Sequence, residues 1–146
     1  MPLMETREIQ TLEELDDIAG DILNRKVSPN RAHVLALSGD LGAGKTAFVK
    51  RLAKKLGINE EITSPTFVVM KSYEIPSHAQ FKTLTHIDAY RIESEDEMRV
   101  LGFAALCADP LQLIAVEWPE RIPSCIPEGA HPIGITLEGN MRSVTF

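Results

Sequence analysis

The stretch "LSGDLGAGKTAF", residues 37–48, places the strongest constraint on the fold of this 146-residue chain. It contains the pattern G-x-x-x-x-G-K-[ST], whose fixed positions are Gly39, Gly44, Lys45 and Thr46. A glycine-rich turn of this kind, placed between a strand and a helix, directs backbone N–H groups and the helix N-terminus toward an anion. The pattern therefore predicts a phosphate-binding loop.

The segments on either side of this loop supply the strand and the helix that it requires. The apolar run "HVLALS" (33–38) leads directly into it, and residues 45–56 follow with apolar side chains at helical spacing up to Gly57. In that setting Lys45 would neutralise the β- and γ-phosphates of a nucleotide, and the Thr46 hydroxyl would bind Mg²⁺.

Together with this loop, the remaining segments predict one α/β domain of the P-loop NTPase class over residues 1–146, with a mixed, mainly parallel sheet flanked by helices and extended by β-hairpins. No internal repeat or linker interrupts the chain. The further elements that we expect are an amphipathic helix over 11–26, a hairpin of 66–75 with 81–88, helical turns at 95–101 and 103–109, a strand over 111–117, and two strands within 131–146 around Gly139.

Charge and hydropathy exclude several classes of protein. The formal net charge of −6 argues against direct tight binding to RNA or DNA, which depends on Lys and Arg displacing counterions from phosphates. Apolar runs are strand-sized, and the N-terminus lacks the apolar stretch of a secretory signal. We expect a cytoplasmic protein without membrane contact, in which Cys107 and Cys125 are reduced structural thiols.

Two acidic residues end predicted strands and are candidates for catalysis. Glu117 ends "LIAVE", where a carboxylate can hold the Mg²⁺ of a nucleotide. Asp88 ends "LTHID", and it could serve either as the metal carboxylate or as the group that orients the attacking water. We expect Lys45, Asp88 and Glu117 to act together in catalysis.

Three neighbouring residues have weaker signals. Thr66, in "TSPTF", sits where a switch loop could sense a γ-phosphate, although an ordinary strand-start threonine is an equal alternative. His86 alternates with Asp88 and is more often a structural residue than a catalyst at such a position. Trp118, the only tryptophan, is more readily explained by packing than by stacking on a base.

Two absences narrow the class of nucleotide-binding protein. No guanine-reading N-K-x-D occurs in the chain, which favours adenine or loose selection of the base. None of Arg91, Arg99, Arg121 and Arg142 is obviously placed as an arginine finger, a residue that raises the rate of phosphoryl transfer by about 10³ to 10⁵. The sequence thus predicts an ATPase that is slow alone and is gated by a partner.

Five spaced motifs, considered together, resemble the bacterial TsaE (YjeE) family. They are "SGDLGAGKTAF", "SPTFVVMKSYE", "HIDAYRI", "DEMRVLGF" and "IAVEWPERI", and the resemblance covers roughly residues 9 to 142. It implies a small ATPase needed to form threonylcarbamoyl-adenosine in tRNA, next to the anticodon. It also implies that the chain docks on the TsaD–TsaB pair, which makes the modification, and that ATP hydrolysis resets that complex.

The same resemblance assigns roles to individual residues. The metal ligands of the family fall on Thr46 and Glu117, and the acid important for hydrolysis falls on Asp88. The pocket for ATP or ADP also draws on the segment near Thr11 and on the late hairpin near Gly139. The phosphate-binding stretch falls on Asp40, Leu41, Gly42, Ala43, Gly44, Lys45 and Thr46.

Two other functions remain open from the sequence. A small-molecule kinase could use the same loop, but the segments after residue 57 leave little material for an acceptor pocket and a lid. A nucleotide-sensing binding module that never hydrolyses is the second alternative.

Overall fold

The computed structural model describes residues 4–25 and 27–146. In this part of the chain seven strands form one sheet, in the order β1-β7-β6-β2-β5-β4-β3. The strands are β1 (Thr6–Ile9), β2 (His33–Ser38), β3 (Met70–Glu74), β4 (Thr83–Asp88), β5 (Gln112–Glu117), β6 (His131–Glu138) and β7 (Met141–Thr145).

The sheet is parallel at its centre and antiparallel at both edges. β2 lies between β5 and β6 and is parallel to both, and β4 is parallel to β5. The edge pairs β1–β7, β6–β7 and β3–β4 are antiparallel. β5 is buried at every position, as expected for a strand covered on both faces. The mixed α/β sheet expected from the sequence is confirmed.

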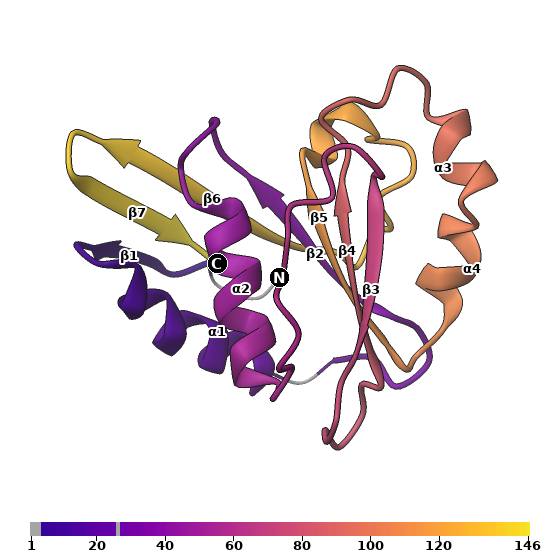
Figure 1. Cartoon of the computed structure of the whole chain (residues 1–146), viewed down its shortest axis with the longest axis horizontal. Helices are drawn as coiled ribbons and strands as arrows, with labels where there is room; N and C mark the ends of the chain where they lie inside the picture. The colour runs from indigo at the N-terminus through magenta and orange to yellow at the C-terminus, as the bar shows by residue number, and fades with distance from the viewer. Residues whose placement is uncertain (1–3, 26) are drawn as a thin grey trace.

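Helices cover both faces of this sheet (Figure 1). On one face α1 (Leu15–Leu23) and α2 (Lys45–Lys55) pack on alternate strand residues such as Leu35 and Leu37. On the other face α3 (Asp96–Val100) and α4 (Phe103–Ala108) pack on the intervening ones, such as Val34. Side chains of a strand alternate between faces, so the two apolar clusters follow from the apolar runs of the sequence.

The N-terminal region differs from the sequence prediction in two ways. The expected helix over 11–26 begins as a 3-10 helix, η1 (Leu12–Glu14), and continues as α1, which ends at Leu23; residue 26 lies outside the described residues. The Thr11 backbone N–H donates to the Glu14 carboxylate at 2.9 Å, as a capping box requires. Strand β1 was not predicted, since its stability comes from pairing with the distant β7.

The predicted hairpin forms, but its first strand is shorter than expected. Residues 66–69 form a turn, and β3 begins only at Met70. The Val69 N–H donates to the Pro65 carbonyl oxygen at 2.6 Å, and Val69 has a positive φ of 68°. This turn keeps Thr66 out of the sheet and leaves its hydroxyl free to reach other side chains.

Two further expectations concern thiols and membranes. Cys107 and Cys125 are both free thiols, as predicted. In the part of the chain that the structure describes, no helix combines the length and the apolar character needed to cross a membrane.

Candidate functional site

The glycine-rich loop connects β2 to the N-terminus of α2, as the sequence predicts. Gly39 and Gly44 have φ angles of 150° and 119°, which side-chain-bearing residues rarely adopt. A Cβ atom at Gly39 would in addition collide with the Ile135 carbonyl oxygen of β6. Glycine is therefore required where the loop leaves the sheet, and this close packing fixes the loop against β6.

Lys45 is the buried cation of the loop. Its ammonium group donates to the carbonyl oxygens of Gly39 and Asp40, the latter at 3.1 Å, and lies 4.0 Å from the centre of the Trp118 ring. Burial is the main cause that lowers the pKa of Lys45, while nearby carboxylates, Glu117 first among them, act in the opposite direction. Within the described residues Lys45 makes no ion pair, so its charge is available to an anion at the loop.

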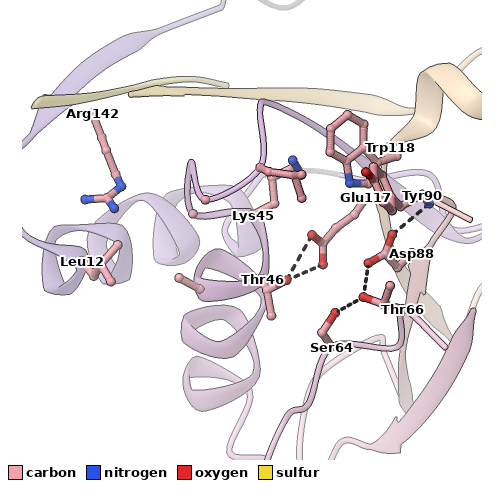
Figure 2. Close-up of a pocket in the computed structure, with 14 residues that line it drawn as sticks. Leu12, Lys45, Thr46, Ser64, Thr66, Asp88, Tyr90, Glu117, Trp118 and Arg142 are labelled. Carbon is pink, nitrogen blue, oxygen red and sulfur yellow. Dashed lines mark hydrogen bonds between the residues drawn. The ribbon is translucent and has the colours of Figure 1, made fainter. Parts of the chain in front are cut away.

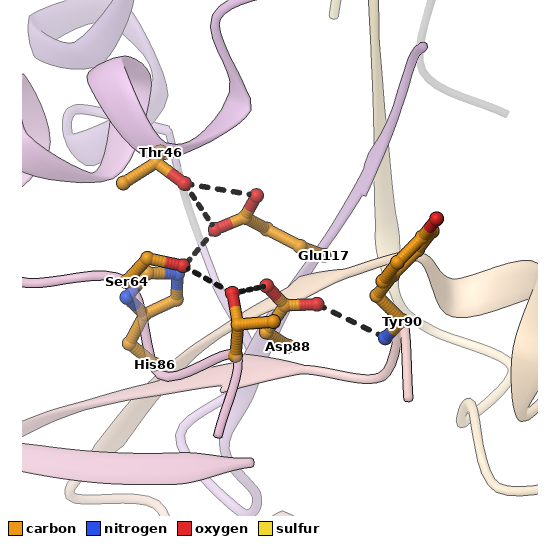
Figure 3. Close-up of polar contacts among 7 residues, drawn as sticks. Thr46, Ser64, His86, Asp88, Tyr90 and Glu117 are labelled. Carbon is orange, nitrogen blue, oxygen red and sulfur yellow. Dashed lines mark hydrogen bonds and ion pairs between the residues drawn. The ribbon is translucent and has the colours of Figure 1, made fainter. Parts of the chain in front are cut away.

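Glu117 lies beside the first turn of α2. The Thr46 hydroxyl is 2.9 Å from Glu117 Oε2 and 3.1 Å from Oε1, and it donates to this carboxylate. His86 Nε2, from β4, is 2.5 Å from Glu117 Oε2 (Figure 3). Parallel pairing of β4 with β5 places Glu117 opposite Asp88 in register. The two acids predicted from the sequence therefore end neighbouring strands at one edge of the sheet.

Asp88 is fixed by hydrogen bonds on both of its oxygens. Oδ2 accepts from the Thr66 hydroxyl at 3.0 Å, and Oδ1 accepts from the Tyr90 backbone N–H at 3.0 Å. Ser64 Oγ lies 2.7 Å from Thr66 Oγ1, so a chain of two hydroxyls leads from the loop after α2 to this carboxylate. Asp88 is thus held in one orientation beside the Thr46–Glu117 pair (Figure 3).

These groups surround one cavity of about 390 Å³. Figure 2 shows Leu12 and Arg142 on one side of it, Thr66 and Asp88 on the other, and Lys45 and Thr46 between them. The lining residues are Leu12, Leu41, Gly42, Gly44, Lys45, Thr46, Ala47, Ser64, Thr66, Asp88, Tyr90, Glu117, Trp118 and Arg142.

Most of the site residues expected from the sequence line this cavity. Those that do are Leu41, Gly42, Gly44, Lys45, Thr46, Thr66, Asp88 and Glu117. Asp40 and Ala43 belong to the same loop and contribute backbone carbonyls to its contacts. Thr11 and Gly139 do not line the cavity; the nearby residues Leu12 and Arg142 do so instead.

Ser64 and Arg142, like Leu12, line the cavity but were not predicted from the sequence. Ser64 precedes a proline, and no local pattern pointed to its contact with Thr66. Arg142 had no assigned role, but its Nε donates to the Ala43 carbonyl oxygen at 2.9 Å and so ties β7 to the glycine-rich loop. The signal for His86 was present in its alternation with Asp88, but its partner on another strand was not predictable from spacing.

The oxygen ligands at the loop suit a magnesium ion that is shared with a phosphate. The Thr46 hydroxyl and the Glu117 carboxylate are hard oxygen donors, which Mg²⁺ prefers, and they lie within 3 Å of each other. In residues 4–25 and 27–146, no cluster of three or more His, Cys, Asp or Glu side chains could hold a metal. These described residues therefore form no metal site made of such side chains alone. The Thr46 hydroxyl and the Glu117 carboxylate are compatible with a site that phosphate oxygens complete.

Comparison with known proteins agrees with this architecture. The sequence model of a family described as "Threonylcarbamoyl adenosine biosynthesis protein TsaE" matches residues 9–144. The crystal structure of YdiB from Bacillus subtilis superposes with a TM-score of 0.74 and 29% sequence identity, covering 100% of this chain and 86% of that one.

Curated relatives support the same assignment. A tRNA threonylcarbamoyladenosine biosynthesis protein TsaE from Treponema pallidum (strain Nichols) is 42% identical over 114 residues, which are 77% of this chain and 79% of the relative. The protein of the same name from Bacillus subtilis (strain 168) is 39% identical over 114 residues, 77% of this chain and 68% of the relative. The chain belongs to the TsaE family of tRNA threonylcarbamoyladenosine biosynthesis.

Proposed function

We propose that this chain is a magnesium-dependent ATPase that assists formation of threonylcarbamoyl-adenosine in tRNA by acting on a TsaD–TsaB complex. The observation that carries the proposal is the hydroxyl–carboxylate pair of Thr46 and Glu117 at the end of a glycine-rich loop, with a second fixed carboxylate, Asp88, in register beside it. A loop that only bound phosphate would have no need for two buried acids.

The phosphate groups of the nucleotide would lie at the loop and the N-terminus of α2. The N-terminus of α2, which begins at Lys45, and the Lys45 ammonium group would provide the positive potential there. In the structure Lys45 donates to carbonyls of its own loop, and phosphate oxygens would replace these acceptors. The absence of an N-K-x-D pattern supports adenine as the base.

Thr46 and Glu117 are the residues that would hold Mg²⁺. When bound, the ion would supply positive charge to the phosphate oxygens and so favour phosphoryl transfer. Glu117 is 3% exposed, and the two hydrogen-bonding partners of its carboxylate, Thr46 and His86, come from different elements. These two contacts fix the orientation of the Glu117 carboxylate before any nucleotide binds.

Asp88 is the candidate for handling the attacking water. Its two oxygens accept hydrogen bonds from Thr66 and Tyr90, so the carboxylate cannot rotate freely. A fixed carboxylate at the cavity wall can accept a hydrogen bond from water and orient it. Because Thr66 sits in the loop that precedes β3, a movement of this loop would break the hydrogen bond that fixes Asp88 Oδ2.

A partner protein is expected to control this movement. The loop that carries Thr66 also exposes Phe67 and Val68 to solvent, Phe67 at 84%, so a partner has direct access to it. By resemblance to the TsaE family, the partner that we propose is the TsaD–TsaB pair. The net charge of −6 supports action on a protein in preference to direct binding of tRNA, and the proposal includes a cytoplasmic location.

Incubation with ATP and Mg²⁺ alone tests the class of reaction. We expect the purified chain to release inorganic phosphate slowly, in amounts equal to the ADP formed, and to stop when the metal is chelated. A small-molecule kinase would release almost no phosphate without an acceptor, and that result would contradict the proposal.

The same assay separates an ATPase from a nucleotide sensor. Glu117→Gln keeps the shape of the side chain but removes its charge, so this variant should retain nucleotide binding without Mg²⁺ and lose most phosphate release. Wild-type chain that binds nucleotide but never releases phosphate would favour the sensor.

A further inference from the structure

His86 lies outside the cavity and contacts the carboxylate of Glu117, the proposed Mg²⁺ ligand. Its side chain is fully buried on β4, and Nε2 lies 2.5 Å from Glu117 Oε2. The same oxygen accepts a hydrogen bond from Thr46 at 2.9 Å. His86 does not line the cavity, so it contacts the site only through Glu117.

The direction of this hydrogen bond follows from the chemistry of the two groups. Both Glu117 oxygens accept from the Thr46 hydroxyl, and a carboxylate oxygen that also accepts from His86 requires the proton to be on Nε2. His86 Nδ1 is buried and has no hydrogen-bond partner among the described residues. An unpaired buried polar atom destabilises a fold. An apolar side chain would avoid that cost, so packing alone does not account for a histidine at this position.

We propose that His86 is a positioning residue, which holds the Glu117 carboxylate toward Thr46 in the orientation that binds Mg²⁺. This inference rests on the proposed function, and it adds a residue that the resemblance leaves without a role. Carboxylates that bind metals commonly accept a hydrogen bond from a residue that does not itself touch the metal. Loss of such a hydrogen bond lowers metal affinity by about 10- to 100-fold.

Two substitutions separate positioning from packing. Gln places an amide N–H at about the reach of Nε2, so His86→Gln should preserve the hydrogen bond to Glu117. Phe fills the ring volume without any donor, so His86→Phe should preserve packing and lose the hydrogen bond. His33→Phe is the matched control, because His33 is a partly buried histidine on β2 that lies outside the cavity.

The measurement is the affinity for a non-hydrolysable ATP analogue by calorimetry, with Mg²⁺ and with chelator. We expect His86→Phe to lose tenfold or more in affinity with Mg²⁺ and to change less than about threefold with chelator. His86→Gln and His33→Phe should stay within about threefold of wild type in both conditions. Equal losses in the Gln and Phe variants, or no loss in either, would overturn the positioning role.

A spectroscopic measurement on the wild-type chain keeps the inference testable even if His86→Phe does not fold. Nitrogen NMR of the labelled imidazole, without nucleotide, should show a proton on Nε2 whose resonance shifts in Glu117→Gln. A proton on Nδ1 alone, or a resonance unaffected by Glu117→Gln, would overturn the proposed contact. If the wild-type chain shows no magnesium-dependent nucleotide binding, the proposed function itself is wrong. If wild type shows such binding and His86→Phe does not weaken it, only the positioning role of His86 is wrong.

Discussion

Three ionisable side chains of the site are almost completely removed from water. Lys45 and Asp88 are each 5% exposed, and Glu117 is 3% exposed. Burial of a charge is unfavourable unless hydrogen bonds or opposite charges compensate it. Lys45 donates to loop carbonyls, and both acids accept hydrogen bonds from fixed donors. At the scale of the residue, the site is therefore a set of charges whose partners are supplied by the protein before any ligand binds.

His33 gives a prediction about pH at the same scale. Burial, and then the neighbouring His131 and Arg25, lower the pKa of His33 from 6.5 to about 4. The unfolded chain therefore binds a proton on His33 between pH 6.5 and 4 that the folded chain does not, so this residue reduces stability as the pH falls through that range and adds no further loss below pH 4.

The expected size of this effect is at most about 2 kcal/mol, because solvent screens part of the ring. Denaturant unfolding at pH 7 and pH 4.5 should show a smaller loss of stability in His33→Phe than in wild type. Identical losses in the two proteins would show that His33 titrates normally in the folded chain.

At the scale of the elements, the site depends on the register between strands and on the position of α2. β4 and β5 end together, so Asp88 lies opposite Glu117, and α2 begins at Lys45 on the same edge of the sheet. The helix is held there by its apolar face, in which Phe48 is fully buried in the core cluster shared with α1. Packing of α2 thus sets the distance between Thr46 and Glu117.

Two phenylalanines test this dependence by chemical denaturation. Phe48→Ala should lower the free energy of unfolding by about 3–5 kcal/mol, because it opens a cavity under α2. Phe67→Ala, at a site 84% exposed, should change it by less than about 1 kcal/mol. Similar losses in both variants would contradict the described packing of α2.

At the scale of the whole molecule, the parts that could be predicted from the sequence are those encoded by continuous segments. β2, the glycine-rich loop and α2 form one local pattern, and β5 is a continuous apolar run. β1 could not be predicted, because Thr6 pairs with Thr145 at the other end of the chain. Likewise, Leu12 and Arg142 reach the cavity only after the sheet has brought β7 next to the N-terminal segment.

The residues of the site also differ in whether a continuous segment of the sequence encodes them. Asp88 and Glu117 each end a segment that reads as a strand, a signal that can be read locally, and the sheet confirms that they lie side by side. The contacts of Glu117 with His86 and of Asp88 with Thr66 join different elements, so no spacing in the sequence specifies them. Chemistry-bearing residues were therefore easier to predict than the residues that orient them.

In the proposed function, this site hydrolyses ATP by means of Asp88 and is controlled by a partner. The most direct test of this proposal is ATP turnover with Mg²⁺, with and without purified TsaD–TsaB, by wild-type chain and by Asp88→Asn at equal nucleotide occupancy. We expect slow turnover by wild type alone, faster turnover with TsaD–TsaB, and about a 100-fold lower rate for Asp88→Asn in both conditions. Equal turnover by wild type and Asp88→Asn, or a wild-type rate that TsaD–TsaB does not change, would contradict the account.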